Sequence, residues 1–212
     1  MAEDSEQRVN RLERRKQRTR AALVRAAQAL IAEGRLNVPV LEITQSADVG
    51  MGSFYNHFDS KEQLFEAAVS DVLDTHGAVL DHLTADIEDP AAVFACSFRL
   101  TGRFFRERPQ ESRILLANWS ALMTSDRGLA PRAMRDIKAA LAAGRFDIDD
   151  PELALTVAAG ALMGLGHLLE RQPHRDAGAT ADAVTESVLQ LFGMSPEDAR
   201  KVCALLLPDL DY

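Results

Sequence analysis

The chain has 212 residues, a formal net charge of −8 and 47% hydrophobic residues, which is ordinary for one large folded domain or two small ones. Its only cysteines are Cys96 and Cys203, and two thiols over this length exclude a disulfide framework. Alanine and leucine are abundant, and β-branched residues nowhere alternate over the length of a strand. The sequence therefore predicts an all-α fold of about ten helices.

The charge is divided unevenly along the chain. Residues 1–61 hold ten basic and eight acidic side chains, a net charge of +2, while the remainder holds 14 basic and 24 acidic ones, a net charge of −10. Residues 7–25 alone contain eight Arg or Lys and one acid, Glu13. The N-terminal part could therefore face a polyanion without opposing charge of its own. No apolar segment of the secretory type begins the chain, so a cytoplasmic location is expected.

The first predicted helix starts at about residue 13, after a flexible basic arm over residues 1–12. Its apolar residues recur every three or four positions, and Gly34 stands where a helix stop is expected. Pro39 can occupy the first turn of a second helix, which is short because its pattern runs only to about Ala47. These features predict a long helix followed by a short one.

A tight turn over residues 48–50 leads into a third, short helix over 51–58. Asp59 or Ser60 then caps a long fourth helix. Two short helices joined by a three-residue turn, between two longer helices, are typical of a helix-turn-helix unit, with its motif at about 39–58. In such a unit the second short helix is the one that reads DNA.

Residues 14–72 resemble the DNA-binding domain of the TetR family of transcriptional regulators in the order and spacing of small, aromatic and capping residues. The positions that carry the resemblance are Ala26, Ala27, Gly34, Ile43, Ala47, Val49, Gly52, Tyr55, His57, Phe58, Ser60, Lys61, Glu62 and Leu64. The sequence departs from the family in its turn, where Asp48 and Gly50 replace the usual glycine and hydroxyl residue. The resemblance implies an N-terminal helix-turn-helix domain, here 13–62, and a helical ligand-binding and dimerisation domain, here 63–212.

The resemblance also implies which side chains meet DNA. Those expected near base edges are Met51, Gly52, Ser53 and Asn56. Those expected at the backbone or adjacent bases are Tyr55, His57 and Lys61, and the same surface is predicted to include Arg18, Arg20 and Thr44. Asparagine can pair with adenine and methionine can touch a thymine methyl group, while the basic arm supplies most of the phosphate attraction.

Residues 153–169 contain no charge, which touches the lower limit for a membrane span of about 17 residues. Thr156, His167 and three glycines argue against a span, so no membrane association is expected. A helix that is apolar all round can instead be buried between its own domain and a partner subunit. A homodimer is therefore predicted, with its interface formed by Ala154, Ala158, Ala161, Leu165, Ala181, Val184, Val188 and Leu191.

The C-terminal part holds enough apolar side chains to line a small-molecule pocket. The candidates are Phe94, Phe98, Thr101, Phe105, Trp119, Met123, Met134, Met163 and His167. No catalytic motif, phosphate-binding loop or metal-ligand spacing is found, so no enzyme, cofactor or metal site is expected. The favoured function is a repressor that a mostly apolar ligand of unknown identity releases from a palindromic DNA operator. An architectural DNA-binding protein without a ligand and a helical metal protein are the alternatives.

Overall fold

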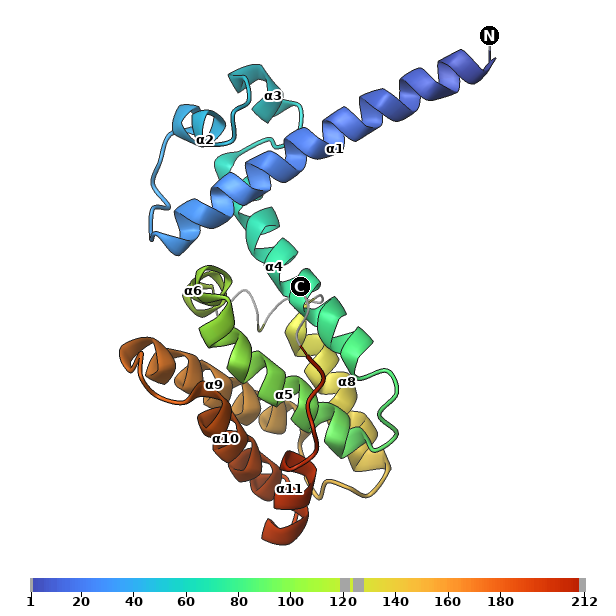
Figure 1. The fold of residues 1–212 in the computed structure, drawn as a ribbon, viewed down its shortest axis with the longest axis vertical. Helices are drawn as coiled ribbons and strands as arrows, with labels where there is room; N and C mark the ends of the chain where they lie inside the picture. Colours follow the sequence, from blue (N-terminus) through green and yellow to red (C-terminus); the bar gives the residue numbers. More distant parts are fainter. Residues whose placement is uncertain (1, 119–122, 124–127, 210–212) are drawn as a thin grey trace. The chain divides into compact units, whose positions relative to one another are not determined.

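A computed structural model describes residues 2–118, 123 and 128–209 (Figure 1). Ten α-helices and no strand are found in these residues, which confirms the predicted all-α fold. The chain divides into two compact units, Met1–Asp71 and Val72–Tyr212. The division falls inside one long helix, α4 (Lys61–Leu83), so both units contain part of this helix.

The N-terminal unit consists of α1 (Ala2–Ala32), α2 (Val40–Ser46), α3 (Met51–Tyr55) and the first part of α4. The prediction of a flexible arm over residues 1–12 is wrong, because the chain is helical from Ala2. Neither proline nor glycine occurs between residues 2 and 32, so nothing in the sequence interrupts the helix. Acidic residues in the first turns also favour a helix start at this point.

Local chemistry sets the ends of these helices. Gly34 ends α1 with φ 72°, a left-handed conformation that glycine adopts without strain. Asp48 has φ 53° in the turn between α2 and α3, the only non-glycine residue with positive φ in the described part. Ser60 caps α4, since its Oγ accepts the Gln63 amide at 3.1 Å while the Gln63 side chain accepts the Asp59 amide at 2.7 Å.

The core of the N-terminal unit fixes α3 against the longer helices. Phe54 on α3 is fully buried, and its ring lies 6.0 Å from that of Phe58. The other fully or almost fully buried side chains of this unit include Leu23, Ala27, Leu30, Ile43, Leu64 and Ala68. The Gln28 amide additionally donates to the Ala68 carbonyl at 3.2 Å and to Asp71 at 3.0 Å, which ties α1 to α4.

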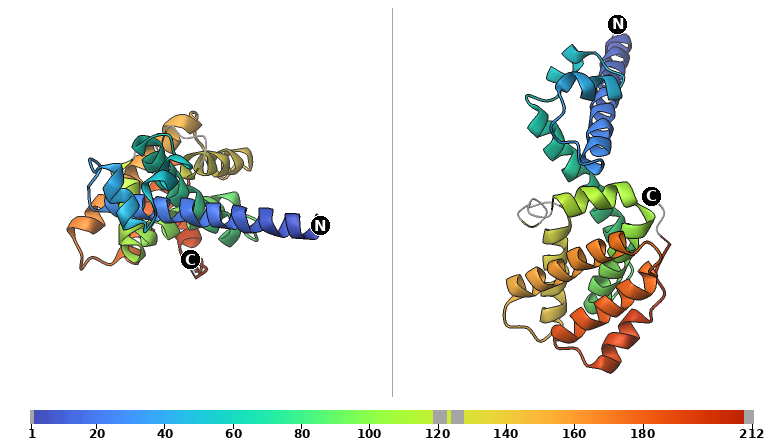
Figure 2. Two further views of the ribbon diagram at one scale, coloured as in Figure 1. Left: turned by 90° about the horizontal axis from the view of Figure 1, so that it is seen from above. Right: turned by 90° about the vertical axis from the view of Figure 1, so that its left-hand side faces the viewer.

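The C-terminal unit is built around α5 (Pro90–Glu107), which packs against five other helices of this unit (Figure 1). These helices are α6 (Pro109–Ala117), α8 (Leu129–Ala142), α9 (Pro151–Arg171), α10 (Ala177–Leu191) and α11 (Pro196–Cys203). Asp150 and Ser195 cap α9 and α11. Figure 2 shows α9 and α10 side by side along one flank of this unit.

Three phenylalanines from distant parts of the chain meet in the centre of this core. Phe94 lies 5.7 Å from Phe146 and 5.5 Å from Phe192, and the last two rings are 5.2 Å apart, measured between ring centroids. Burying three such rings contributes several kcal/mol, at about 25 cal/mol for each Å² of apolar surface removed from water. This cluster holds α5, the segment after α8 and the end of α10 together.

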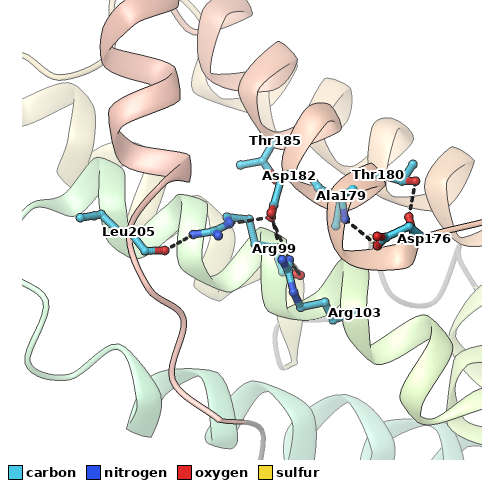
Figure 3. Close-up of polar contacts among 9 residues, drawn as sticks. Arg99, Arg103, Asp176, Ala179, Thr180, Asp182, Thr185 and Leu205 are labelled. Carbon is cyan, nitrogen blue, oxygen red and sulfur yellow. Dashed lines mark hydrogen bonds and ion pairs between the residues drawn. The ribbon is translucent and has the colours of Figure 1, made fainter.

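Two arginines join α5 to α10, and one of them, the buried Arg99, also contacts the C-terminal segment (Figure 3). The Arg99 Nε donates to Asp182 at 2.7 Å, and Arg103 donates to both oxygens of the same carboxylate at 2.9 and 3.0 Å. The Arg99 Nη1 also donates to the Leu205 carbonyl at 2.8 Å. Because the Arg99 side chain is only 7% exposed, these partners must compensate for the water that its charged group loses on burial.

Candidate functional site

Helix α3 presents a neutral, largely exposed face to solvent. Met51 is 44% and Tyr55 60% exposed, Gly52 and Asn56 are exposed, and Ser53 is half-buried. Phe54, the residue between them, faces the core. The short polar and apolar groups that can read base edges therefore share one accessible surface.

Gly52 has no structural reason to be glycine within this chain. Its backbone is not in the left-handed region, and a Cβ added there would meet no atom within 4 Å. Glycine inside a helix costs about 1 kcal/mol relative to alanine, and Gly50 just before the helix is equally open. A close approach by something outside the chain, such as the edge of a base pair, would account for a glycine at this position.

Positive charge lies beside α3. The Arg20 guanidinium stands over the Phe58 ring at 5.2 Å from its centroid, a stabilising cation–π contact. Partial burial, and then the nearby charges of Lys16 and Arg20, lower the pKa of His57. His57 is half-buried and is neutral above that pKa, while Arg18 is exposed and Lys61 is half-buried at the start of α4. This arrangement suits phosphate contacts around a neutral reading helix.

Thr44 is the exception among the predicted DNA contacts. Its side chain is 1% exposed, and its hydroxyl donates to the Leu41 carbonyl at 2.9 Å. The prediction that Thr44 touches DNA is wrong for this reason. The exposed positions of α2 at this point are Leu41, Gln45 and Ser46 instead.

The C-terminal unit contains a cavity of about 70 Å³ bounded by α4, α5, α8 and α9. A smaller apolar space of about 50 Å³ shares part of its wall. The apolar lining of the cavity consists of Leu80, Phe94, Phe98, Leu129, Ala133 and Leu162. Three predicted pocket residues, Phe94, Phe98 and Thr101, line the cavity, and Met123 lines the smaller space.

A cluster of two arginines and two aspartates forms one wall of the cavity. Arg132 donates through Nε to Asp81 at 2.6 Å and through Nη1 to the Gly128 carbonyl at 2.7 Å. Arg135 donates to Asp81 at 3.0 Å and to Asp136 at 2.9 Å. The formal charges of the four side chains cancel, so the wall offers donors and acceptors without a surplus of either sign.

Burial and ion pairing act differently on the two carboxylates. Burial raises the pKa of Asp136, against the hydrogen bond from Arg135. Burial also acts to raise the pKa of Asp81, but hydrogen bonds from Arg132 and Arg135 outweigh it and lower the value. Of the two carboxylates, Asp81 therefore holds its negative charge to lower pH, and Asp136 accepts a proton more readily.

The remaining predicted pocket residues lie elsewhere or outside the described residues. Phe105 borders a different, mostly polar hollow beside α6 and α9. His167 is exposed, with its Nδ1 3.7 Å from Glu170, and Met134 and Met163 are half-buried but line neither apolar space. Trp119 falls outside the described residues. The charged wall was missed, although Asp136 beside the buried Ile137 on an apolar helix face was a signal for it.

The predicted dimer interface requires a correction. Ala154, Ala158, Leu165, Ala181 and Val188 are each at most 6% exposed in the single chain, because they pack into its own core. Ala161 and Val184 are half-buried, and Leu191 alone is widely exposed, at 68%. The free face of α9 carries Leu153, Val157, Gly160 and Gly164, and that of α10 carries Ala183, Ser187 and Leu191.

Together, the reading helix flanked by cations and the apolar cavity in a separate helical unit define a helix-turn-helix transcriptional regulator with a ligand-binding domain. Residues 23–68 match the family of bacterial regulatory proteins of the tetR type, and residues 89–204 match the tetracyclin repressor-like C-terminal domain. The chain belongs to the TetR family. This family consists of transcriptional regulators rather than enzymes.

Known relatives agree with this assignment. The structure of RolR without ligand is 33% identical and has a TM-score of 0.74, covering 91% of this chain and all of that one. The structure of RolR in complex with resorcinol is 31% identical with a TM-score of 0.65, covering 94% of this chain and all of that one.

Among curated proteins, the regulator TtgR of Pseudomonas putida is 30% identical over 108 residues, half of each chain. The repressor KstR2 of Mycolicibacterium smegmatis is 34% identical over 84 residues, 37% of this chain and 41% of that protein. The chain therefore spans about half the length, or less, of these curated relatives.

Proposed function

We propose that the protein is a cytoplasmic, homodimeric repressor without catalytic activity, which leaves a two-fold symmetric operator when a small neutral hydroxylated ring compound fills its cavity. The observation that carries the DNA part is the exposed, uncharged face of α3 with an unneeded glycine at its centre and cations beside it. Phosphate attraction would come from α1 and Lys61, and sequence preference from Met51, Ser53 and Asn56.

Selection of bound sequences from a random DNA pool tests this assignment. We expect a palindromic site whose halves lie about one helical turn apart, roughly 34 to 36 Å. The substitution Asn56→Ala should relax the preference at particular base pairs by about 1 to 3 kcal/mol. Arg18→Ala is the matched control, because it should weaken binding to all sequences alike. A broad footprint without sequence preference would favour the architectural alternative.

The dimer would form through the free faces of α9 and α10. Leu153 is 59% and Val157 38% exposed, and Cβ atoms added at Gly160 and Gly164 would meet nothing within 4 Å. Two glycines one helical turn apart permit a second helix to approach closely. An apolar, flat surface of this kind is suited to burial against its own copy about a two-fold axis.

Charge substitution on that face tests the dimer. Leu153→Arg combined with Val157→Arg should yield a folded monomer in sedimentation velocity, because a partner subunit would have to bury two unpaired charges. Leu206→Arg is the matched control, since Leu206 is 99% exposed and lies outside both helices. A double variant that sediments as a dimer would contradict the proposed interface.

The ligand class follows from the size and chemistry of the cavity. Apolar cavities of about 150 Å³ accommodate benzene, and drug-sized ligands need about 300 Å³ or more. The cavity and its smaller neighbour, about 70 and 50 Å³, are below both sizes, so the pocket is nearer the size of a single ring than of a drug-sized ligand. A hydroxyl group both donates and accepts, so it could meet Asp81 and Arg132 at once, whereas a carboxylate would face two aspartates. Resorcinol, the ligand in the RolR complex, is a ring with two hydroxyls.

Thermal unfolding with different ring compounds tests the ligand class. Resorcinol should raise the melting temperature, since a ligand at 100 times its Kd stabilises the folded state by about 2.7 kcal/mol. Benzene, which lacks hydroxyls, and benzoate, which carries a charge, should produce smaller shifts at the same concentration. Resorcinol should also release operator DNA in a binding assay. Equal shifts for resorcinol and benzoate would contradict a charge-balanced site.

A further inference from the structure

Arg132 touches α4 at a position where only glycine leaves room for it. A Cβ added to Gly77 would lie 2.7 Å from the Arg132 Nη1, 2.8 Å from its Cζ and 2.9 Å from its Nε. No real Cβ contact is that short, so the guanidinium rests against the backbone of α4. Gly77 is buried in mid-helix and is not in a left-handed conformation, so its backbone alone does not require glycine.

The same guanidinium is fixed on three sides. Asp81, one helical turn after Gly77 on α4, accepts from Arg132 Nε at 2.6 Å. The Gly128 carbonyl, directly before α8, accepts from Arg132 Nη1 at 2.7 Å. The cavity lies on the remaining side, because Asp81 and Arg132 both line it. One planar group thus joins α4, the start of α8 and the space proposed for the ligand.

We infer that Gly77 is a positioning residue for ligand response, because it seats Arg132 on α4 and so makes this helix part of the ligand site. The inference rests on the proposed function for the cavity and extends it to its regulation. A hydroxyl that accepts from Arg132 or donates to Asp81 competes with the hydrogen bond between these residues. The Arg132 guanidinium then shifts relative to the backbone at Gly77. Since α4 continues without interruption back to Lys61 in the N-terminal unit, a change at Gly77 acts on the helix that both units share.

A second close approach supports this role for α4. A Cβ added to Gly128 would lie 2.9 Å from the Cβ of Leu73, one turn before Gly77. Leu73, Gly77 and Asp81 therefore form a row on α4 that meets the segment from Gly128 to Arg132. A ligand that binds this row with different affinity in the DNA-bound and free states would shift the balance between them.

Gly77→Ala tests the inference directly. The atoms it would displace belong to the far end of a flexible side chain, so the variant should fold while Arg132 leaves its seat. In the wild type, the Arg132 Nε–H should give a slowly exchanging NMR signal, and in Gly77→Ala this signal should be lost. Resorcinol affinity should fall at least about tenfold, the loss expected for one charge-assisted hydrogen bond. Thr75→Ala, at an exposed position of the same helix, is the matched control and should change neither readout.

A double-mutant cycle separates this role from general damage to α4. If Gly77 acts through Arg132, Gly77→Ala should have no further effect on resorcinol affinity or on DNA release in an Arg132→Ala background. Equal losses in both backgrounds, or an unchanged Arg132 Nε–H signal in Gly77→Ala, would overturn the inference. A wild-type protein that does not bind resorcinol would instead overturn the proposed ligand, while the NMR comparison still decides whether Gly77 seats Arg132.

Discussion

The surroundings of glycine differ between the two units of the molecule, apart from Gly144, Gly160 and Gly164 of the C-terminal unit, which are as open as the glycines of the N-terminal unit. In the N-terminal unit a Cβ added to Gly34, Gly50 or Gly52 would meet nothing within 4 Å. In the C-terminal unit five glycines have a neighbouring atom within 3.0 Å of that position, namely Gly77, Gly102, Gly128, Gly166 and Gly193. The second group lets parts of the same chain approach one another, whereas Gly50 and Gly52 leave space for another molecule.

Arginines follow the same division. In the described part of the chain, no carboxylate forms an ion pair with Arg18 or Arg20, and both are exposed. Arg99, Arg132 and Arg145 of the C-terminal unit each pair with an aspartate at 2.6 to 2.8 Å. Arg35 of the N-terminal unit does pair with Glu33 and Glu42, so the contrast holds for the arginines beside α3, which are free for a partner, and for those of the C-terminal unit, which connect parts of the same chain. The same kind of substitution can be made in both units, and equal effects in the two units would contradict this comparison.

The largest expected effect is on the pH dependence of stability, where His76 of the C-terminal unit should contribute much more than His57 of the N-terminal unit. Burial lowers the pKa of His76 to about 4, from 6.5 in the unfolded chain, so between these values only the unfolded state takes up the proton. Stability should therefore fall as the pH drops from about 6.5 to about 4, by up to about 3 kcal/mol from this group. Urea unfolding at several pH values should show a flatter profile for His76→Asn than for the wild type. His57→Asn, at a half-buried position where the pKa is also lowered, should flatten the profile less, and equal flattening by both variants would break the comparison.

The next effect concerns the carboxylate shared by two arginines in Figure 3. Asp182→Asn should destabilise the protein by about 2 to 3 kcal/mol, since Arg99 and Arg103 would keep their charges without an anion. The value lies at the low end for buried pairs because the Asp182 side chain is 30% exposed. Chemical denaturation measures it, and a loss under about 0.5 kcal/mol would show that these charges are satisfied by water.

A pair of identical substitutions sharpens the glycine comparison. In Gly102→Ala the new Cβ would lie 2.5 Å from that of Ala181, which should force α5 and α10 apart at a cost of about 2 kcal/mol. In Gly52→Ala stability should be unchanged or rise by up to about 1 kcal/mol, while operator affinity falls. Thermal unfolding and DNA titration of both variants test this. Normal operator binding by Gly52→Ala would show that DNA does not approach this position closely enough to require glycine.

The smallest expected effect on stability is that of Arg18→Ala, within about 0.5 kcal/mol of the wild type. Its DNA affinity should nevertheless fall for every sequence, and the slope of log K against log salt should decrease in magnitude by about one. Titrations at several salt concentrations measure this slope. An unchanged slope would mean that Arg18 makes no phosphate contact.

Features that depend on neighbouring residues were predictable from the sequence. The stop at Gly34, the caps at Ser60, Asp150 and Ser195, and the helix-turn-helix motif all follow from residues within a few positions of one another. The start of α1 was the exception, because a highly charged segment gives no apolar period even where it is helical.

Features that depend on distant residues were not predictable. The contact of Asp81 with Arg132 joins residues 51 positions apart, and nothing local in either segment indicates its partner. The prediction of the free face of α9 was wrong for a related reason. In a helix with apolar residues on every side, the sequence does not show which side its own domain covers. For Thr44, periodicity could not show that the hydroxyl turns back to its own helix.

The cancelling charges of Asp81, Asp136, Arg132 and Arg135 also bear on how a signal would reach the protein. A compound matched to this wall by being uncharged is also one that a lipid bilayer does not strongly repel, since charge is what makes the hydrocarbon layer costly to cross. Such a compound would equilibrate across the cell envelope without a dedicated carrier. Under the proposed function, occupancy of the cavity would then follow the concentration outside the cell, and the regulator would report on its surroundings.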